Sequence, residues 1–303
     1  GAIDFAHRGS KMTISTAFDI PLAESPCVGC GQCAQACPTG AIVVKNDIAK
    51  VWKALDDRGT KVTVQIAPAV RVALGRELGI APGENAMGRI VAALRRMGFD
   101  EIYDTSTSAD LTVLEESNEL AKRLGEGKAE LPLFSSCCPA WVRYCETRYP
   151  ELMEHVSTCK SPMEMFAAVL RDKYQAKDAA DGRRTYHMAI MPCTAKKFEA
   201  VRDEFKVEGK QDVDYVLTTQ ELVRMIKESG IMFRDIEPEA VDMPFGTMTG
   251  AGVIFGVTGG VTEAVLRRLA SDKSNTALMS IAYTGVRGME GVKEARVMVG
   301  EKE

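Results

Sequence analysis

The sequence predicts an α/β fold, with a small cysteine-rich segment over residues 1–45 and a larger, mainly parallel α/β domain over residues 46–303. Three observations support this prediction. Four cysteines fall within eleven residues near the N-terminus, and strand-like and helix-like stretches alternate from residue 61 onward. An apolar share of 46% over 303 residues is enough to build a buried core.

The first half of the larger domain alternates between strand and helix. A strand-like run at 61–68 is followed by a helix over 84–98, where Met87, Ile90 and Leu94 lie on one face at a 3.6-residue period, together with Val91 and Met97. After these come a strand at 101–105, a helix at about 110–124 and a short strand, LPLFSS, at 131–136.

The second half continues the pattern. Ser161 and Glu164, with Pro162 between them, predict a capping box at a helix start. Strands are expected at 186–192 and 213–219, and a second capping box at Thr218 and Glu221 opens a helix that stops near Gly230. Strands that alternate with helices predict a parallel sheet, whose sites lie at the C-terminal ends of the strands.

Charge and hydropathy narrow the range of partners. A net charge of −4 and a pI near 5.7 give no reason to expect nucleic acid or an anionic membrane, although a small basic electron carrier remains compatible. The chain has no apolar run of membrane-spanning length, and its N-terminus lacks the pattern of a secretory signal. We therefore expect a cytoplasmic protein that binds neither nucleic acid nor membrane.

The segment CVGCGQCAQACP places Cys27, Cys30, Cys33 and Cys37 at the spacing C-x2-C-x2-C-x3-C-P. This spacing is typical of [4Fe-4S] clusters, whereas zinc sites favour C-x2-C pairs separated by longer spacers. Residues 1–45 are therefore predicted to be a partial ferredoxin-like [4Fe-4S] domain.

In modules with two clusters, the fourth cysteine of such a run binds the other cluster. Cys27, Cys30 and Cys33 would then share one cluster, and Cys37 would reach back to a second. We expect the preceding half of the domain to lie before Gly1; the alternative is that all four thiolates hold one cluster.

The other five cysteines are Cys137, Cys138, Cys145, Cys159 and Cys193. Cys138 and Cys193 lie where strands give way to helix starts, which favours thiolates and makes both candidate iron ligands. Adjacent side chains on a strand point to opposite faces, so Cys137 should stay free when Cys138 binds metal. Cys145 and Cys159 are expected to be buried, inert thiols.

Three segments resemble the iron-only ([FeFe]) hydrogenases: FSSCCPAW at 134–141, MPCTAKKFE at 191–199 and GAGVIFGVTGGVTEAVLRR at 250–268. The resemblance implies an H-cluster, a [4Fe-4S] cubane bridged to a two-iron unit that carries CO, CN and a dithiolate bridge. It also implies that Cys138 and Cys193 bind the cubane and that the Cys137 thiol passes protons to the dithiolate amine.

The resemblance assigns further residues. Lys196 would contact a cyanide, with Met191 and Phe255 beside the two-iron unit and Pro68 on its other side.

Glu116, Glu119 and Ser157 match the family's proton path from Cys137. Without the resemblance, two glutamates at i, i+3 would indicate a solvated helix face. The glycine-rich stretch 246–260 fits no phosphate-binding motif well, and tight backbone packing is the preferred interpretation.

The sequence also departs from the family pattern. The family's third cysteine loop, which supplies two more cubane ligands, does not occur before the chain stops at Glu303, so we expect no turnover from these 303 residues alone. Ala69, Ala140 and Met163 are smaller departures.

The resemblance implies a ferredoxin hydrogenase, which reversibly reduces protons to H2 with electrons from ferredoxin or a similar carrier. Hydrogenase maturation proteins and NAD(P)H-linked electron-transfer subunits are the other partners that it implies. Two alternatives remain open: a hydrogenase-like iron–sulfur assembly protein and a hydrogen-sensing regulatory relative. The Cys137 proton path favours the enzyme, because an assembly factor needs none.

Overall fold

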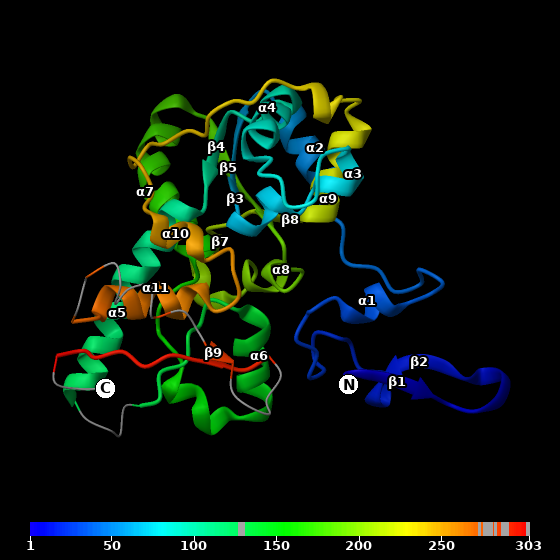
Figure 1. Cartoon of the computed structure of the whole chain (residues 1–303). Coiled ribbons are helices and arrows are strands. Elements are labelled where there is room, and N and C mark those ends of the chain that lie inside the picture. The colour runs from blue at the N-terminus through cyan, green and yellow to red at the C-terminus, as the bar shows by residue number, and fades with distance from the viewer. Residues whose placement is uncertain (127–130, 272–273, 275–280, 282–283, 286–290, 301–303) are drawn as a thin grey trace.

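The computed structural model describes residues 1–126, 131–271, 274, 281, 284–285 and 291–300 (Figure 1). The last three residues of the predicted second domain, 301–303, lie outside these ranges. At the centre is a four-stranded sheet in the order β4 (Glu101–Asp104), β3 (Thr60–Ile66), β5 (Arg184–Met191) and β8 (Tyr215–Thr218). All three pairings are parallel, as the alternating pattern predicted.

Helices cover both faces of the sheet. Figure 1 places α7 (Pro162–Asp181) on one side and α2 (Ile48–Asp56), α4 (Met87–Met97) and α9 (Thr219–Glu228) on the other. The remaining helices extend the structure beyond the C-terminal ends of the strands or connect elements: α3 (Gly75–Leu78), α5 (Ser106–Glu126), α6 (Pro139–Arg148), α8 (Lys196–Glu199), α10 (Gly250–Ile254) and α11 (Gly260–Leu269).

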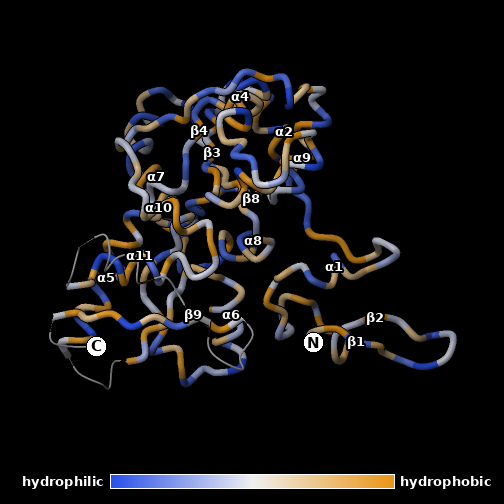
Figure 2. Tube along the Cα trace, viewed as in Figure 1, coloured by the Kyte–Doolittle hydropathy of each residue, from blue (hydrophilic) through white to orange (hydrophobic). Residues whose placement is uncertain are grey.

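The core forms because β3 is buried on both faces. Val62, Val64 and Ile66 are inaccessible to solvent, and so is Gln65 on the opposite face. A strand enclosed by helices on both sides has this composition in parallel sheets. On the predicted face of α4, Ile90, Val91 and Leu94 are fully buried and Met97 is buried, whereas Met87 is only partly buried. Figure 2 shows apolar segments gathered between the helices around the β3 label.

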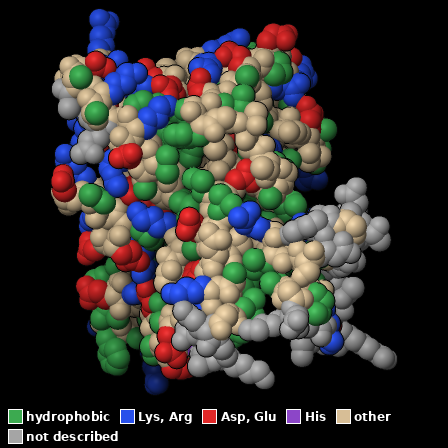
Figure 3. Space-filling model, turned by 90° about the vertical axis from the view of Figure 1, so that its left-hand side faces the viewer, with side chains coloured by type: hydrophobic (Ala, Val, Ile, Leu, Met, Phe, Trp, Pro, Cys, Tyr) green, Lys and Arg blue, Asp and Glu red, His purple; other side chains and the backbone are tan. Residues whose placement is uncertain are grey.

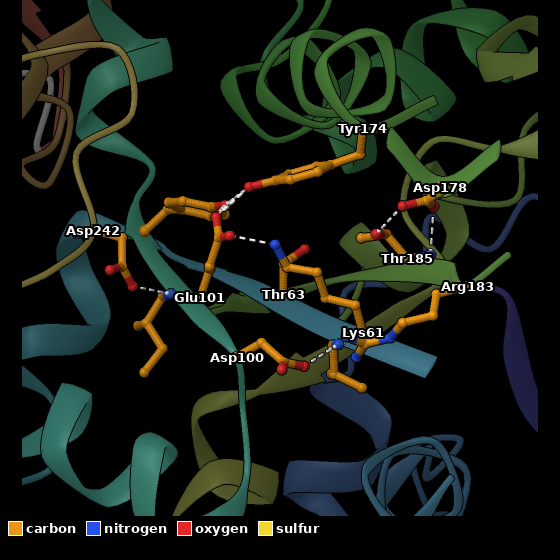
Figure 4. Close-up of polar contacts among 12 residues, drawn as sticks. Lys61, Thr63, Asp100, Glu101, Tyr174, Asp178, Arg183, Thr185 and Asp242 are labelled. Carbon is orange, nitrogen blue, oxygen red and sulfur yellow. Dashed lines mark hydrogen bonds and ion pairs between the residues drawn. The ribbon is translucent and has the colours of Figure 1, made fainter. Parts of the chain in front are cut away.

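A half-buried ion pair holds the N-terminal end of the sheet (Figure 4). The carboxylate of Glu101 accepts hydrogen bonds from the hydroxyls of Tyr103 and Tyr174 and pairs with the Lys61 ammonium. Burial opposes ionisation of Glu101, but these donors outweigh it and hold the pKa of that carboxyl at about 2. The cluster joins β3, β4 and α7 at the end of the strands opposite to the candidate site.

The N-terminal segment projects from the body of the molecule (Figure 1). It contains an antiparallel hairpin of β1 (Ile3–Ala6) and β2 (Thr13–Thr16), then the short helix α1 (Gln32–Ala36). Phe18 is 98% exposed and Phe5 is also exposed. Two further short pairings are β6 (Lys206–Val207) with β7 (Lys210–Gln211), and β9 (Thr284–Gly285) with β10 (Lys293–Glu294).

Two local predictions need correction. The expected strand at 131–136 is reduced to a single parallel bridge between Phe134 and Val156, because no other residue of this segment pairs with a strand within the described ranges. At the start of α7, Ser161 Oγ accepts from the Glu164 backbone N–H, but the Glu164 carboxyl makes no return bond. The box at Thr218 and Glu221 is complete.

None of the helices in the described ranges combines the length and apolar composition needed to cross a bilayer. On the face drawn in Figure 3, Lys and Arg side chains are interspersed with Asp and Glu.

Candidate active site

The candidate site lies beyond the C-terminal ends of the central strands, as expected for a parallel sheet. Pro68 follows β3 after one residue, and Met191 is the last residue of β5. Cys193 follows Met191 by two residues and precedes α8, a single helical turn that begins at Lys196. The predicted junction between strand and helix at Cys193 is therefore present, although its helix is short.

Lys196 joins the two cysteine loops. Its side chain is buried, and its Nζ donates to the backbone carbonyl oxygen of Cys137 over 3.0 Å and pairs with the Glu199 carboxylate over 2.6 Å. An ammonium carries three hydrogens, so these two acceptors leave one donor for a bound group. The loop around Cys137 and Cys138 is thus held against the loop that carries Cys193.

The adjacent cysteines differ in environment. Cys138 is exposed, lies in an extended conformation and immediately precedes Pro139, the first residue of α6. The Cys137 side chain is half-buried. Burial raises the pKa of the Cys137 thiol, although the nearby Lys196 charge works against this shift. Cys137 therefore keeps its proton, and Cys138 is open to a ligand role.

The glycine-rich stretch packs tightly, as its sequence suggested. A Cβ atom on Gly252 would lie 2.2 Å from the Ser106 carbonyl oxygen, and one on Gly260 would lie 1.9 Å from the Ile254 carbonyl oxygen. A Cβ on Gly256 would lie 3.3 Å from Pro68, so the residue after Phe255 sits against Pro68. The predicted pair of lining residues, Phe255 and Pro68, therefore comes from two segments that the fold brings together.

Glu119 accepts several hydrogen bonds at one end of the predicted proton path. Ser157 Oγ donates to Glu119 Oε2 over 2.6 Å, and Arg123 pairs with Oε1 over 2.6 Å. The Cys159 thiol lies 3.6 Å from Oε2. Burial works against ionisation, but the donors from Ser157 and Arg123 prevail and lower the pKa of Glu119.

Glu116 lies one turn earlier on α5 and has the opposite electrostatic setting. Its side chain is 4% exposed, and Ser135 Oγ donates to its Oε2 over 3.3 Å. Burial raises the pKa of Glu116, and the neighbouring Glu119 charge adds to the rise. The two carboxyls therefore differ in proton affinity, with the more basic one closer to Cys137.

The two loops beside α5 are joined by backbone bonds. Phe134 N donates to the His155 carbonyl oxygen over 2.8 Å, and Ser157 N donates to the Phe134 carbonyl oxygen over 2.7 Å. Ser136 Oγ donates to the Cys159 carbonyl oxygen over 2.6 Å. These bonds bring Ser157 from a distant part of the sequence to the cysteine pair.

The cysteines of the N-terminal segment lie on a loop and on α1. Cys30 and Cys33 are exposed, and the Gly29 N–H lies 3.4 Å from Cys27 Sγ. Thr39 and the backbone N–H groups around it lower the pKa of Cys37 to about 7. Such N–H donors suit cluster-bound thiolates. No three His, Cys, Asp or Glu side chains in the described ranges surround a single-ion site.

The cysteine-rich loop contacts the loop of Cys193. Thr194 Oγ1 donates to the Gly29 carbonyl oxygen over 2.6 Å. Gly31 has φ of +76°, and a Cβ there would lie 2.9 Å from Thr194 Oγ1. The two predicted cluster sites therefore lie on loops that touch.

Sequence reasoning missed several residues here, and helical or strand spacing could have found three of them. Arg123 follows Glu119 by four residues, and Glu199 follows Lys196 by three, both on shared helix faces. Ser135 precedes Cys137 by two residues, which places both on one side of an extended segment. The Cys159 contact with Glu119 depends on tertiary structure, so no local pattern shows it.

Comparisons with known families cover nearly the whole chain. The family profile described as "Iron only hydrogenase large subunit, C-terminal domain" matches residues 60–303, and the profile described as "4Fe-4S binding domain" matches residues 21–43.

Two similar relatives are named hydrogenases. The "NADP-reducing hydrogenase subunit HndD" of Solidesulfovibrio fructosivorans is 44% identical over 100% of this chain and 53% of its own length. The "Periplasmic [Fe] hydrogenase large subunit" of Nitratidesulfovibrio vulgaris is 43% identical over 93% of this chain and 75% of its own length. The chain spans about half the length of HndD.

A solved structure shares the fold. A variant of the [FeFe]-hydrogenase HydA1 from Chlamydomonas reinhardtii has a TM-score of 0.69 and 40% identity, with coverage of 82% of this chain and 63% of that chain. "Protein NAR1" of Arabidopsis thaliana is a more distant relative, 29% identical over 83% of this chain and 57% of its own length.

Proposed function

This chain belongs to the iron-only hydrogenase family, and we propose that the complete protein is a ferredoxin hydrogenase that reversibly reduces protons to H2. The chain forms an α/β hydrogenase fold with a [4Fe-4S]-binding segment. The observation that carries the proposal is the row of proton-bearing groups from Cys137 through Glu116 toward Glu119 beside the joined cysteine loops.

The donor groups present fit two of the cubane positions of an H-cluster. Cys138 offers an exposed thiol, and Cys193 lies on the loop that Lys196 ties to it. The third N–H of Lys196 suits a cyanide, and Met191 supplies a buried apolar wall. When bound, the H-cluster supplies the redox chemistry that interconverts protons, electrons and H2.

The chain's own residues hold and move protons. Cys137 keeps its proton because burial raises the pKa of its thiol. Its Sγ lies 3.7 Å from Ser135 Oγ, which donates to Glu116 on α5. Glu116 is basic enough to accept a proton, while Glu119 is held as the anion by Ser157 and Arg123. A proton that reaches Glu119 has therefore passed from the interior to a carboxylate beside Thr158, which is exposed.

Electrons would enter through the N-terminal segment. Cys27, Cys30, Cys33 and Cys37 are proposed to bind [4Fe-4S] clusters, and the Thr194 contact with Gly29 brings their loop to that of Cys193. Ferredoxin or a similar carrier is the proposed donor. Similarity to an NADP-reducing hydrogenase subunit supports NAD(P)H-linked subunits as further partners. Maturation proteins and a cytoplasmic location stay predictions from the sequence.

An iron–sulfur assembly role is the second candidate, since relatives at 25–30% identity include proteins named for cytosolic iron–sulfur assembly. The proton-bearing groups favour the hydrogenase, because assembly requires no proton transfer.

One experiment separates the two functions. The complete protein is produced without oxygen together with hydrogenase maturation proteins, and hydrogen evolution from a reduced dye is measured with infrared spectra of bound CO and CN. The hydrogenase proposal predicts both hydrogen and these bands. Loaded [4Fe-4S] clusters with neither hydrogen nor CO and CN bands, together with rescue of an extract depleted of cluster-assembly activity, would overturn it.

A further inference from the structure

The cysteine-rich segment at 29–47 is attached at both ends to the part of the chain that follows β5. At the start of the segment, Thr194 Oγ1 donates to the Gly29 carbonyl oxygen over 2.6 Å. At its end, the Lys197 ammonium pairs with Asp47 Oδ2 over 3.0 Å. Two residues of one short stretch therefore hold both ends of a much longer one.

The segment between the two attachments has little regular structure. Apart from the five residues of α1 it contains no helix or strand, and residues 37–47 run from α1 to α2 in an irregular conformation (Figure 1). Cys30 and Cys33 are exposed, and Cys37 is half-buried. The positions of these proposed cluster ligands relative to Cys193 therefore depend on where the ends of the segment are held.

Lys197 joins the end of the segment to the central fold. Its side chain is 9% exposed, and its Nζ also donates to Glu221 Oε1 over 3.0 Å and to the Val216 carbonyl oxygen over 2.6 Å. An ammonium has three hydrogens, so these two acceptors and Asp47 use all of them. The Asp47 N–H donates to the same Glu221 oxygen over 3.0 Å. Lys197 thus fastens Asp47 to β8 and α9.

Asp47 is held as an anion by two lysines with different reach. Burial works against ionisation of Asp47, but Lys197 and Lys50 outweigh it and lower the pKa of that carboxyl. Lys50 contacts the other oxygen, Oδ1, over 3.1 Å, and it lies on α2, directly after Asp47 in the chain. Of these two lysines, only Lys197 connects Asp47 to the chain after β5.

We propose that Lys197 is a positioning residue that, together with Thr194, fixes the N-terminal cysteine segment relative to Cys193 and so sets the rate of electron transfer between the two proposed cluster sites. This deepens the proposed function and rests on it. Two electrons that cross between the segments combine with two protons to give one H2, and in reverse one H2 releases both pairs. A displacement of about 1 Å between reacting groups can slow a step about a hundredfold.

The test follows electrons inside the complete matured protein, so that no external carrier is needed. Oxidised protein is mixed with H2, and reduction of the [4Fe-4S] clusters of the N-terminal segment is followed by rapid freezing and electron paramagnetic resonance. Isotope exchange between H2 and D2O is measured in parallel, because it requires no electron transfer between the segments. We expect Lys197→Met to slow cluster reduction about tenfold or more and to leave isotope exchange nearly unchanged.

Two further variants complete the test. Lys50→Met removes the local partner of the same carboxylate and should leave both rates unchanged. Asp47→Asn keeps the shape of the side chain but weakens the bond to Lys197 from the other end. It should slow cluster reduction without slowing isotope exchange, and it decides the question if Lys197→Met does not fold.

A second measurement needs no cluster. Amide hydrogen exchange at residues 37–47 of the unloaded protein should be faster in Lys197→Met than in the parent, because the end of the segment is released. The same exchange in Lys50→Met should match that of the parent.

The outcomes separate the positioning role from the proposed function. If Lys197→Met reduces its clusters as fast as the parent, or loses isotope exchange as much as cluster reduction, the positioning role is wrong and the hydrogenase proposal stands. If the parent itself catalyses no isotope exchange, the proposed function fails.

Discussion

The Nζ atom of Lys196 lies 3.0 Å from the backbone carbonyl oxygen of Cys137. This bond joins the loop that follows β5 to the loop that precedes α6, and each loop carries one proposed iron ligand, Cys193 and Cys138. The Glu199 carboxylate, 2.6 Å away, pairs with this buried ammonium. The relative position of the two cysteine loops therefore depends on a lysine that is only 9% exposed.

Replacing Lys196 should destabilise the protein strongly. Lys196→Met leaves the Glu199 carboxylate buried without its partner, and we expect a loss of about 3–5 kcal/mol in the free energy of unfolding. Denaturant titration measures it. Lys227→Met, which breaks an exposed pair with Glu77, should leave stability nearly unchanged. Equal effects of the two substitutions would contradict the importance of the buried contact.

The buried carboxyl of Glu164 should make the stability of the protein depend on pH. This carboxyl is fully buried without a hydrogen-bond partner. Burial and the Glu199 charge raise the pKa of Glu164 to about 8, against Lys196 and Lys160. Unfolding returns the pKa to its ordinary value near 4.5, so the unfolded chain binds fewer protons between these two values. The contribution to stability is thus full below pH 4.5 and falls as the pH rises toward 8.

Glu164→Gln should remove this slope. The free energy of unfolding of the variant, minus that of the parent, should be roughly 2–4 kcal/mol larger at high pH than at pH 5. Denaturant unfolding at both pH values measures this change. Glu115→Gln, at an exposed position, serves as the control. The same pH slope in Glu164→Gln and the parent would show that Glu164 is not the group responsible.

Gly252 and Gly250 provide a matched pair within α10. A Cβ on Gly252 would meet the Ser106 carbonyl oxygen, whereas one on Gly250 has no atom within 4 Å. Gly252→Ala should therefore lower the free energy of unfolding by about 1–3 kcal/mol, and Gly250→Ala should leave it unchanged or slightly raised. If both alanines are tolerated equally, α10 does not pack against α5 as described.

Gly31 tests the contact between the two cluster loops. Gly31 and Gly40 both have positive φ, but a Cβ on Gly31 would meet Thr194 whereas one on Gly40 would meet no atom within 4 Å. Gly31→Ala should therefore accelerate amide hydrogen exchange at residues 193–199, and Gly40→Ala should not. Unchanged exchange in Gly31→Ala would mean that the loops do not depend on this contact.

Much of the fold could be predicted because its signals are local. The buried face of α4 follows from the spacing of Ile90 and Leu94, and the parallel sheet follows from the alternation of strands and helices. The prediction of a strand at 131–136 was wrong. The composition of this segment is strand-like, but its spatial neighbours, which the sequence does not show, form only one bridge with it. Glu164 has the spacing of a capping residue, but burial beside Lys196 overrides the local pattern.

Less of the candidate site than of the fold could be predicted from the chain alone. The chain alone placed Cys138 at a helix start and Cys193 just after a strand, whereas Phe255, Pro68 and the proton carriers came from family resemblance. The contacts of Ser135 and Cys159 depend on the pairing of two loops far apart in sequence, so they required the structure.

The proton role of Cys137 is the most direct test of this account. Hydrogen evolution from a reduced dye should be compared between the matured complete protein and its Cys137→Ala variant, at equal iron content and equal intensity of the CO and CN infrared bands. We expect the variant to lose activity by about a hundredfold or more. Unchanged hydrogen evolution by Cys137→Ala at equal cluster content would contradict the account.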